Sequence, residues 1–168
     1  MFRIFSILSI TILLFAVQSC AQNKEFISPD GRFSIDLGSK PTEDGNSPEA
    51  KVGGKKLWWR TEQASFSVSY ADNPNATRDL AKNAVNTSAD GYIASLPKSA
   101  AVVSRKEIEL NGFPGVEIRS RESDGYTVVT RYYMVETRLY CIMALWNAGR
   151  VDSDVIRRLD SFKVKVQT

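Results

Sequence analysis

Apolar and polar residues alternate along several short stretches of the chain, and this pattern predicts β-strands that bury one face. Residues 32–37 and 64–70 show it most clearly, because every second residue is apolar and the residues between are charged or serine. A period of two is the repeat of a strand whose side chains point alternately to the two faces of a sheet. The predicted strands start at Phe26 and cover residues 32–37, 55–61, 64–70, 102–110, 116–121, 126–135, 138–146 and 162–166.

Two segments follow a helical repeat instead. Apolar residues recur at four-residue steps from Leu80 onward, which predicts a helix over residues 76–96 that ends before Pro97. A shorter segment that begins at Asp152 or Ser153 predicts a second helix.

Two connections carry clear turn chemistry. Asn111-Gly112 predicts a tight hairpin, and Phe113-Pro114-Gly115 after it predicts a β-bulge. Residues 38–54 hold glycines, prolines and acidic side chains, and we interpret them as a long surface loop.

The stretch from Leu139 to Trp146 decides the predicted architecture. Both alternating sets of its side chains are apolar, so this strand is expected to be buried on both faces. Both faces of its sheet then need cover, and the two helices are the obvious covers. We therefore expect an α+β fold, in which a central, mostly antiparallel sheet is covered by helices, rather than a β-sandwich.

The N-terminal segment is typical of a secretion signal. Arg3 precedes an apolar run over residues 4–17, which is shorter than a membrane-spanning helix needs. The string VQSC at residues 17–20 resembles the lipobox of bacterial lipoproteins. That resemblance implies that Cys20 is lipidated and becomes the first residue of the mature protein. The alternative is cleavage after Ala21, which would discard Cys20.

The lipoprotein interpretation divides the chain into three parts. Residues 1–19 are a signal peptide, residues 20–25 a lipidated tether, and residues 26–168 a single α+β domain. The non-acidic Ala21 favours the outer membrane, on its periplasmic side, by the sorting pattern of such lipoproteins. Two or more acyl chains would hold the domain stably at the membrane, whereas one chain binds only marginally.

Composition narrows the expected chemistry. The 22 basic and 19 acidic residues give a formal charge of +3, which falls to +2 when Arg3 leaves with the signal peptide. No basic block is present, so nucleic acid is not an expected partner. The sequence contains no histidine, which excludes histidine-based triads, histidine-bearing zinc sites and the HExxH helix.

The positions of the cysteines and acidic residues suggest little further chemistry. If Cys20 carries lipid, Cys141 has no cysteine with which to form an internal disulfide, and its apolar neighbours predict an inert side chain. The Glu43-Asp44 loop leaves open a weak divalent-cation site, which would need several converging oxygen ligands. We expect no catalytic residues, no metal ligand set and no cofactor.

One cluster is a candidate binding surface. Lys55, Lys56, Trp58, Trp59 and Arg60 stand together, and aromatic and arginine residues often anchor interfaces. Adjacent strand residues face opposite sides, so at most one tryptophan is expected in the core. The alternative is that the second tryptophan lies under a helix or loop.

A second aromatic set favours the core. Tyr132, Tyr133, Tyr140 and Trp146 could line a pocket for an apolar or sugar-like ligand. Their positions in alternating strands fit core packing better.

Four segments of the chain resemble the PsbP/Mog1-like superfamily, and more narrowly its small uncharacterised bacterial exported members. They are FISPDGRFSIDLGSKP, LNGFPGVEIRSR, TRYYMVETRLYCIMAL and LDSFKV. The resemblance covers residues 26–166 and implies an α/β/α sandwich around an antiparallel sheet. In that superfamily, PsbP members assist the oxygen-evolving complex and Mog1 members bind a small GTPase. It therefore implies an accessory or binding role, although a fold alone does not transfer an activity.

The sequence thus predicts a non-catalytic, membrane-tethered accessory or binding lipoprotein of the bacterial envelope, with an unidentified protein partner there. One alternative is a small-ligand carrier with an apolar pocket beside the sheet. The other is a hydrolase that uses paired carboxylates, which requires two of them in one solvent-open hollow.

Overall fold

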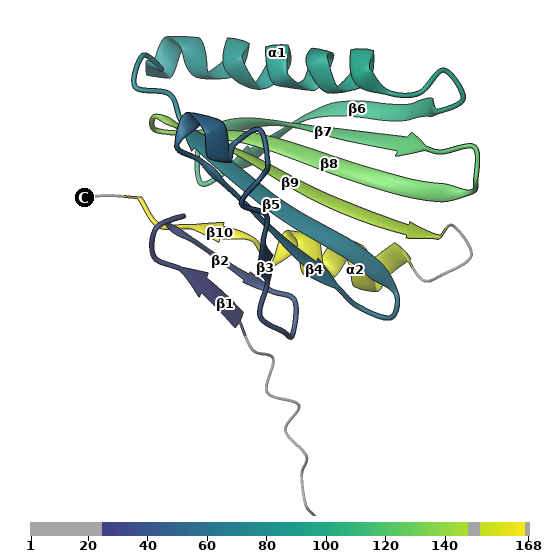
Figure 1. Cartoon of the computed structure of the whole chain (residues 1–168). Coiled ribbons are helices and arrows are strands. Elements are labelled where there is room, and N and C mark those ends of the chain that lie inside the picture. Colours follow the sequence, from purple (N-terminus) through teal and green to yellow (C-terminus); the bar gives the residue numbers. More distant parts are fainter. Residues whose placement is uncertain (1–24, 148–151, 167–168) are drawn as a thin grey trace, which may run out of the picture.

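The computed structural model describes residues 25–147 and 152–166, and the predicted signal peptide, Cys20 and most of the tether lie outside them (Figure 1). The described chain forms ten strands, two α-helices and one 3-10 helix. They are β1 (Glu25–Ser28), β2 (Phe33–Asp36), β3 (Thr42–Glu43), η1 (Ala50–Val52), β4 (Lys55–Arg60), β5 (Ala64–Asp72), α1 (Arg78–Ser95), β6 (Ala101–Leu110), β7 (Phe113–Arg121), β8 (Tyr126–Val135), β9 (Arg138–Asn147), α2 (Asp152–Asp160) and β10 (Lys163–Val164).

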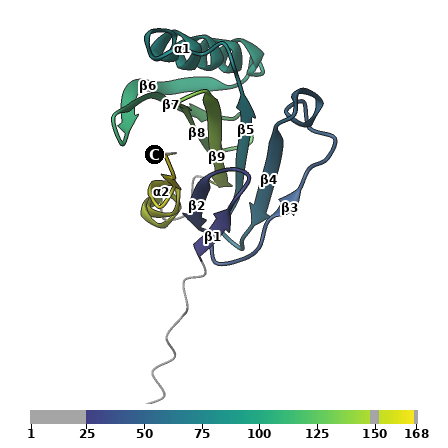
Figure 2. The same cartoon turned by 90° about the vertical axis from the view of Figure 1, so that its left-hand side faces the viewer.

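Seven strands build the main sheet, in the order β3-β4-β5-β9-β8-β7-β6, and every neighbouring pair is antiparallel. Helix α1 lies on one face of this sheet, which we call the upper face. Helix α2 and a three-stranded sheet of order β1-β2-β10 lie on the other, lower face (Figures 1 and 2). This arrangement confirms the predicted α+β fold with a central antiparallel sheet covered by helices.

The second sheet is the main feature that the sequence pattern did not predict. β2 pairs with β1 on one side and with β10, from the other end of the chain, on the other side. These short strands therefore join the two ends of the domain in a separate layer, and α2 is only part of the lower cover. The loop predicted over residues 38–54 likewise contains β3 and η1.

The hairpin prediction is half right. Asn111 and Gly112 form the tight turn between β6 and β7, with φ angles of 51° and 81°, as a type I′ turn requires. The bulge predicted at Phe113–Gly115 is wrong, because the β6–β7 register runs unbroken there from Leu110↔Phe113 to Ile108↔Gly115. The register shifts instead between Val102 and Ser104, at the far end of β6.

Aromatic rings fill the lower core, between the main sheet and the small sheet. Phe33 of β2 lies at its centre, with ring centroids 5.4 Å from Phe162, 6.1 Å from Tyr70 and 6.3 Å from Tyr140. Tyr133, Tyr140 and Trp146 are all buried in this cluster, which confirms core packing for three of the four aromatics considered above. Tyr132 faces the other way and packs against the upper core.

The upper core is smaller and is made by α1. Three small or medium side chains of the helix, Ala81, Val85 and Ala89, pack against residues of β7 and β8. Alanine side chains let the helix approach the sheet closely, so the contact between α1 and the sheet is narrow. Helix α1 therefore covers one side of the upper face and does not extend over β4 and β5 (Figure 2).

Arg138 joins the β1–β2 turn to the ends of β5 and β9 in the main sheet. Its guanidinium donates two hydrogen bonds to the carboxylate of Asp72, at 2.7 and 2.6 Å, and a third to the carbonyl oxygen of Asp30. It also lies over the ring of Tyr70, 4.8 Å from the centroid. Nearby, the Tyr140 hydroxyl donates to the carbonyl oxygen of Gly31 at 2.7 Å. These contacts, which we call the Arg138 clamp, fix the small sheet against the large one.

We expect Arg138→Leu to lower the free energy of unfolding by about 2–3 kcal/mol, because it removes three hydrogen bonds made by a buried, charged guanidinium. Urea unfolding measures this change. Lys82→Leu is the matched control, since Lys82 and Glu107 form an exposed pair at 2.9 Å that is worth about 0.5 kcal/mol or less. Equal losses in the two variants would contradict the clamp.

The clamp also sets a pH dependence. Hydrogen bonds from Arg138 hold the pKa of Asp72 below its usual range. The stability that Asp72 adds is therefore complete above its unfolded pKa of about 3.9, and is lost as the pH falls through the lower folded pKa. Asp72→Asn should make unfolding less dependent on pH in that acid range.

Candidate functional site

The structure divides the predicted tryptophan cluster between the two faces of β4. Trp59 points into the lower core, is 1% exposed and donates from Nε1 to the carbonyl oxygen of Ser39 at 3.0 Å. Trp58 points to the upper face and is 37% exposed. The expectation that at most one of Trp58 and Trp59 lies in the core is confirmed, and Trp59 does not belong to any exposed surface.

The basic residues divide in the same way. Lys55 opposes Tyr70 in the sheet, and its ammonium lies 3.3 Å from Asp30 and 3.7 Å from Glu43. The hydrogen bond to Asp30, helped by Glu43, raises the pKa of Lys55. Lys56 and Arg60 instead share the parity of Trp58. The structure therefore brings together Lys56, Trp58 and Arg60.

A hollow opens beside Trp58 on the upper face. It encloses about 320 Å³ between β4, β5 and β9. We call it the Trp58 groove, and its lining residues are Asp44, Lys56, Trp58, Ser65, Phe66, Ser67, Met143 and Leu145.

Strand register explains why this hollow exists. Trp58 lies opposite Ser67, which lies opposite Met143, so one row across three strands reads large, small, large. The next row places Arg60, Ser65 and Leu145 in the same order. The serines of β5 form a low floor between two taller walls, because neighbouring strands are only about 4.8 Å apart.

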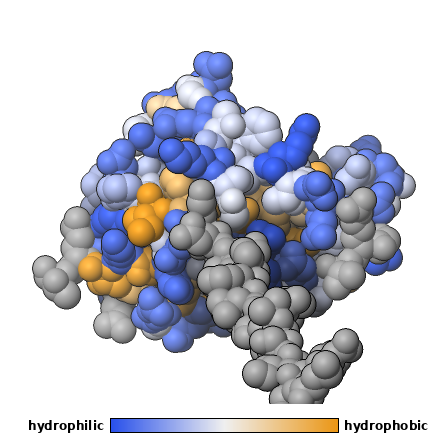
Figure 3. Space-filling view, turned by 90° about the horizontal axis from the view of Figure 1, so that it is seen from below, coloured by the Kyte–Doolittle hydropathy of each residue, from blue (hydrophilic) through white to orange (hydrophobic). Residues whose placement is uncertain are grey.

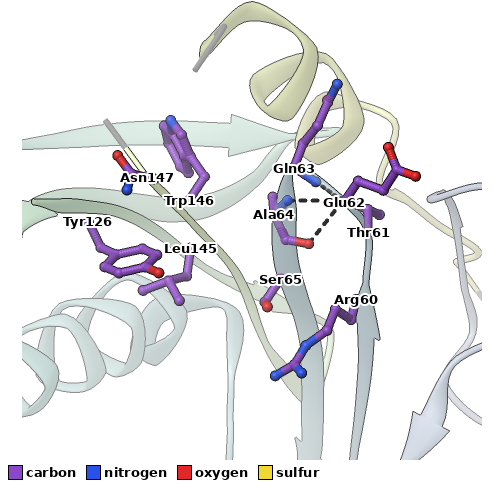
Figure 4. Close-up of a pocket in the computed structure, with 10 residues that line it drawn as sticks. All are labelled: Arg60, Thr61, Glu62, Gln63, Ala64, Ser65, Tyr126, Leu145, Trp146 and Asn147. Carbon is purple, nitrogen blue, oxygen red and sulfur yellow. Dashed lines mark hydrogen bonds between the residues drawn. The ribbon is translucent and has the colours of Figure 1, made fainter. Parts of the chain in front are cut away.

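A second hollow of about 640 Å³ continues from the groove at the ends of the strands (Figure 4). Ser65 and Leu145 line both hollows. Figure 4 shows Tyr126, Leu145 and Arg60 on the side of α1, whereas Trp146 points to the opposite side, towards α2. Tyr126 is 36% exposed, so the upper face carries a second accessible aromatic ring.

Two cations stand beside Trp58, Lys56 in the lining of the groove and Arg60 next to it. Within the described ranges, neither Lys56 nor Arg60 forms an ion pair, although most arginines there do. The Arg60 guanidinium lies over the ring of Trp58, 5.8 Å from its centroid. Asp44 is the acidic residue of the groove, and its Oδ1 accepts a hydrogen bond from the backbone N–H of Asn46.

The remaining candidates give no catalytic arrangement. Burial raises the pKa of the Cys141 thiol to about 11, so the reactive thiolate is scarce at neutral pH. No group of three metal-ligating side chains is found among residues 25–147 and 152–166. The structure adds one pair of carboxylates that the sequence did not suggest, Glu107 and Glu109 in a hollow of about 180 Å³ under α1, and Glu107 there is paired with Lys82.

Sequence reasoning missed the wall and floor of the groove. Met143 and Leu145 were expected to be fully buried, yet both remain half-buried because α1 does not reach them. The alternation of residues between the two faces of β4 would have revealed part of the groove. Lys56 and Arg60 lie two residues from Trp58, so a charged face and a core face containing Leu57 and Trp59 could have been separated by sequence alone.

Comparison with known proteins identifies the fold. No protein-family model and no curated protein matches the chain. The solution structure of cyanobacterial PsbP (CyanoP) from Synechocystis sp. PCC 6803 is similar, with a TM-score of 0.57 and 12% identity over 84% of this chain and 92% of that one.

Two further structures are similar at the same level. A Pseudomonas aeruginosa protein of unknown function, PA94, has a TM-score of 0.51 and 12% identity over 86% of this chain and 97% of that one. A crystal structure from Bacteroides thetaiotaomicron VPI-5482 has a TM-score of 0.52 and 13% identity over 87% of this chain. The match spans 50% of that longer chain.

The chain therefore has a PsbP-like fold, and the likeness is structural only. Neither α1 nor α2 of the described chain has the length and apolarity to cross a bilayer.

We expect the two tryptophans of β4 to differ sharply on truncation. Trp59→Ala should lower the free energy of unfolding by about 3–5 kcal/mol, since it empties a core site. Trp58→Ala should cost about 1 kcal/mol, because the ring is partly exposed. Urea unfolding gives both values, and iodide quenching of fluorescence should weaken only in the Trp58 variant. Similar costs for the two variants would contradict this assignment.

Proposed function

We propose that this protein is a non-catalytic binding lipoprotein of the bacterial cell envelope. In this proposal, lipid on Cys20 holds the domain at the membrane, on the periplasmic side of the outer membrane where the cell has one. The Trp58 groove then contacts a partner in the same compartment.

The groove is the observation that carries the binding role. A half-exposed tryptophan flanked by two cations without ion pairs is an unusual surface, because charged side chains in this protein are mostly paired. Tryptophan and arginine dominate the energetics of protein interfaces. The PsbP-like fold supports the same class of function, as an accessory protein rather than an enzyme.

The tether supports the membrane location. Four residues, 21–24, lie between the predicted lipidated cysteine and the start of β1 at Glu25, so five peptide units join the two. Fully extended, they span about 17 Å. A lipid anchor on Cys20 would thus keep the domain within one domain diameter of the bilayer, where it meets other membrane-held proteins at high local concentration.

A small-ligand carrier is the second candidate, and a different hollow favours it. About 380 Å³ is enclosed between the start of α1 and the β6–β7 and β8–β9 turns, with Phe113, Pro114 and Met134 in its lining. Volumes above about 300 Å³ suit small ligands. Native mass spectrometry of protein isolated from cells should then show a bound molecule that Ala81→Trp displaces, and protein free of added mass would exclude the carrier.

The anchor is tested by fractionation. We expect Cys20→Ser to move the protein from the membrane pellet to the soluble periplasmic fraction, because no acyl chain is then attached. Cys141→Ser is the matched control and should stay in the pellet, with the mass of two or more acyl chains. If Cys20→Ser pellets like the unaltered protein, the lipoprotein proposal is wrong.

A further inference from the structure

We propose that the Trp58 groove binds an extended acidic segment of a partner protein, on the side of the domain that faces away from its own membrane. The segment carries an apolar side chain between two carboxylates. The chemistry of the segment follows from the groove itself, and the orientation rests on the lipid anchor of the proposed function.

The spacing of the groove residues sets the pattern of the segment. Lys56, Trp58 and Arg60 stand at alternate positions of one strand, so they repeat about every 6.8 Å along it. An extended peptide has the same repeat. Its side chains at positions i−2, i and i+2 therefore face the groove in register, which favours the pattern Glu-x-Phe-x-Glu.

The walls fit the central apolar side chain. Trp58 and Met143 lie two strands apart, about 9.6 Å, with only Ser67 between them. A phenylalanine ring or a branched leucine side chain fills such a gap and removes apolar surface of both walls from water. Interfaces of this kind gain most of their affinity from one buried anchor.

The floor can bind the backbone of the segment. Within the part of the chain that the structure describes, no hydrogen bond engages the hydroxyls of Ser65 or Ser67. Both residues are half-buried and line the groove. Each hydroxyl can donate to a carbonyl oxygen or accept from an N–H of an extended peptide.

Charge selects an acidic partner. Lys56 lines the groove and Arg60 lies next to it over the Trp58 ring, and neither cation forms an ion pair in the described ranges. Carboxylates at both ends of the segment would complete two ion pairs at the rim. Such rim charges steer association and reject basic partners more than they add affinity.

The fold separates the groove from the tether. β1, where the described chain begins after the tether, belongs to the layer on the lower face, and the groove opens on the upper face with α1 (Figures 1 and 2). Seen from below, the surface of the lower side mixes hydrophilic residues with small apolar patches (Figure 3). A short tether on β1 would place this lower side towards the bilayer and the groove towards the opposing space.

Peptide binding to the detergent-solubilised full chain tests the proposal. The probe is a fluorescein-labelled nonapeptide with Glu-x-Phe-x-Glu at its centre, and the control peptide has lysines in place of the glutamates. We expect the acidic peptide to bind at least about tenfold more tightly, with affinity that falls as salt is added. Equal affinities, or no binding at about millimolar peptide, would overturn the proposal.

Variants locate the site. Trp58→Ala and Ser67→Phe, which fills the floor, should each weaken binding at least about tenfold. Lys56→Glu and Arg60→Glu should invert the preference between the two peptides, and Lys98→Glu, an exposed charge outside the groove, should leave it unchanged. Circular dichroism confirms that each variant is folded. Unchanged affinity in Trp58→Ala and Ser67→Phe alike would place binding elsewhere and overturn the assignment.

An experiment with lipid vesicles distinguishes this inference from the function proposed above. Vesicles of phosphatidylglycerol and phosphatidylethanolamine are added to the peptide complex. If they displace the peptide, and Trp58→Ala abolishes vesicle binding, the groove is a membrane-contact face and the inference fails. Because the peptide assay needs no lipid anchor, its result is independent of whether Cys20→Ser leaves the membrane pellet.

Discussion

The structure depends on one constraint, which is that β9 is apolar on both faces and both faces must be kept from water. A helix covers a strip about 10 Å wide, whereas seven strands at about 4.8 Å spacing span nearly 30 Å. One helix can therefore cover roughly two strands. On the lower face, α2 and the three-stranded sheet together complete the cover. On the upper face, α1 covers β7 and β8, and the η1 loop covers a small further area. The Trp58 groove is the part of this face that stays uncovered.

Local patterns were sufficient to predict most elements. The strand from Tyr126 to Val135 was predicted to the residue, and the Asn111-Gly112 turn was predicted because its chemistry demands positive φ angles. The second sheet was not predictable, since the pairing of β2 with β10 joins residues far apart in sequence. Alternation with a period of two shows that a strand has two different faces, but it does not show which strands lie next to it in the sheet.

The candidate site was predicted in part, for related reasons. The cluster around Trp58 was recognised by composition, yet Trp59 and Lys55 turned out to face away from it. Met143 and Leu145 gave no signal, because an apolar residue on a central strand reads as core whether or not a helix reaches it. The PsbP-like fold does not add the missing information, since likeness at 12% identity is a likeness of fold.

The register shift in β6 also affects how readily molecules of this protein aggregate. β6 is a ten-residue edge strand, and such edges are templates for pairing with another molecule. Its register shift beside Val103 breaks the straight row of free N–H and C=O groups, and Arg105, Lys106 and Glu107 place charge along it. With the proposed lipid anchor, copies of the domain would diffuse in two dimensions and collide often. An interrupted, charged edge would let this domain stay crowded at a surface without growing into fibrils.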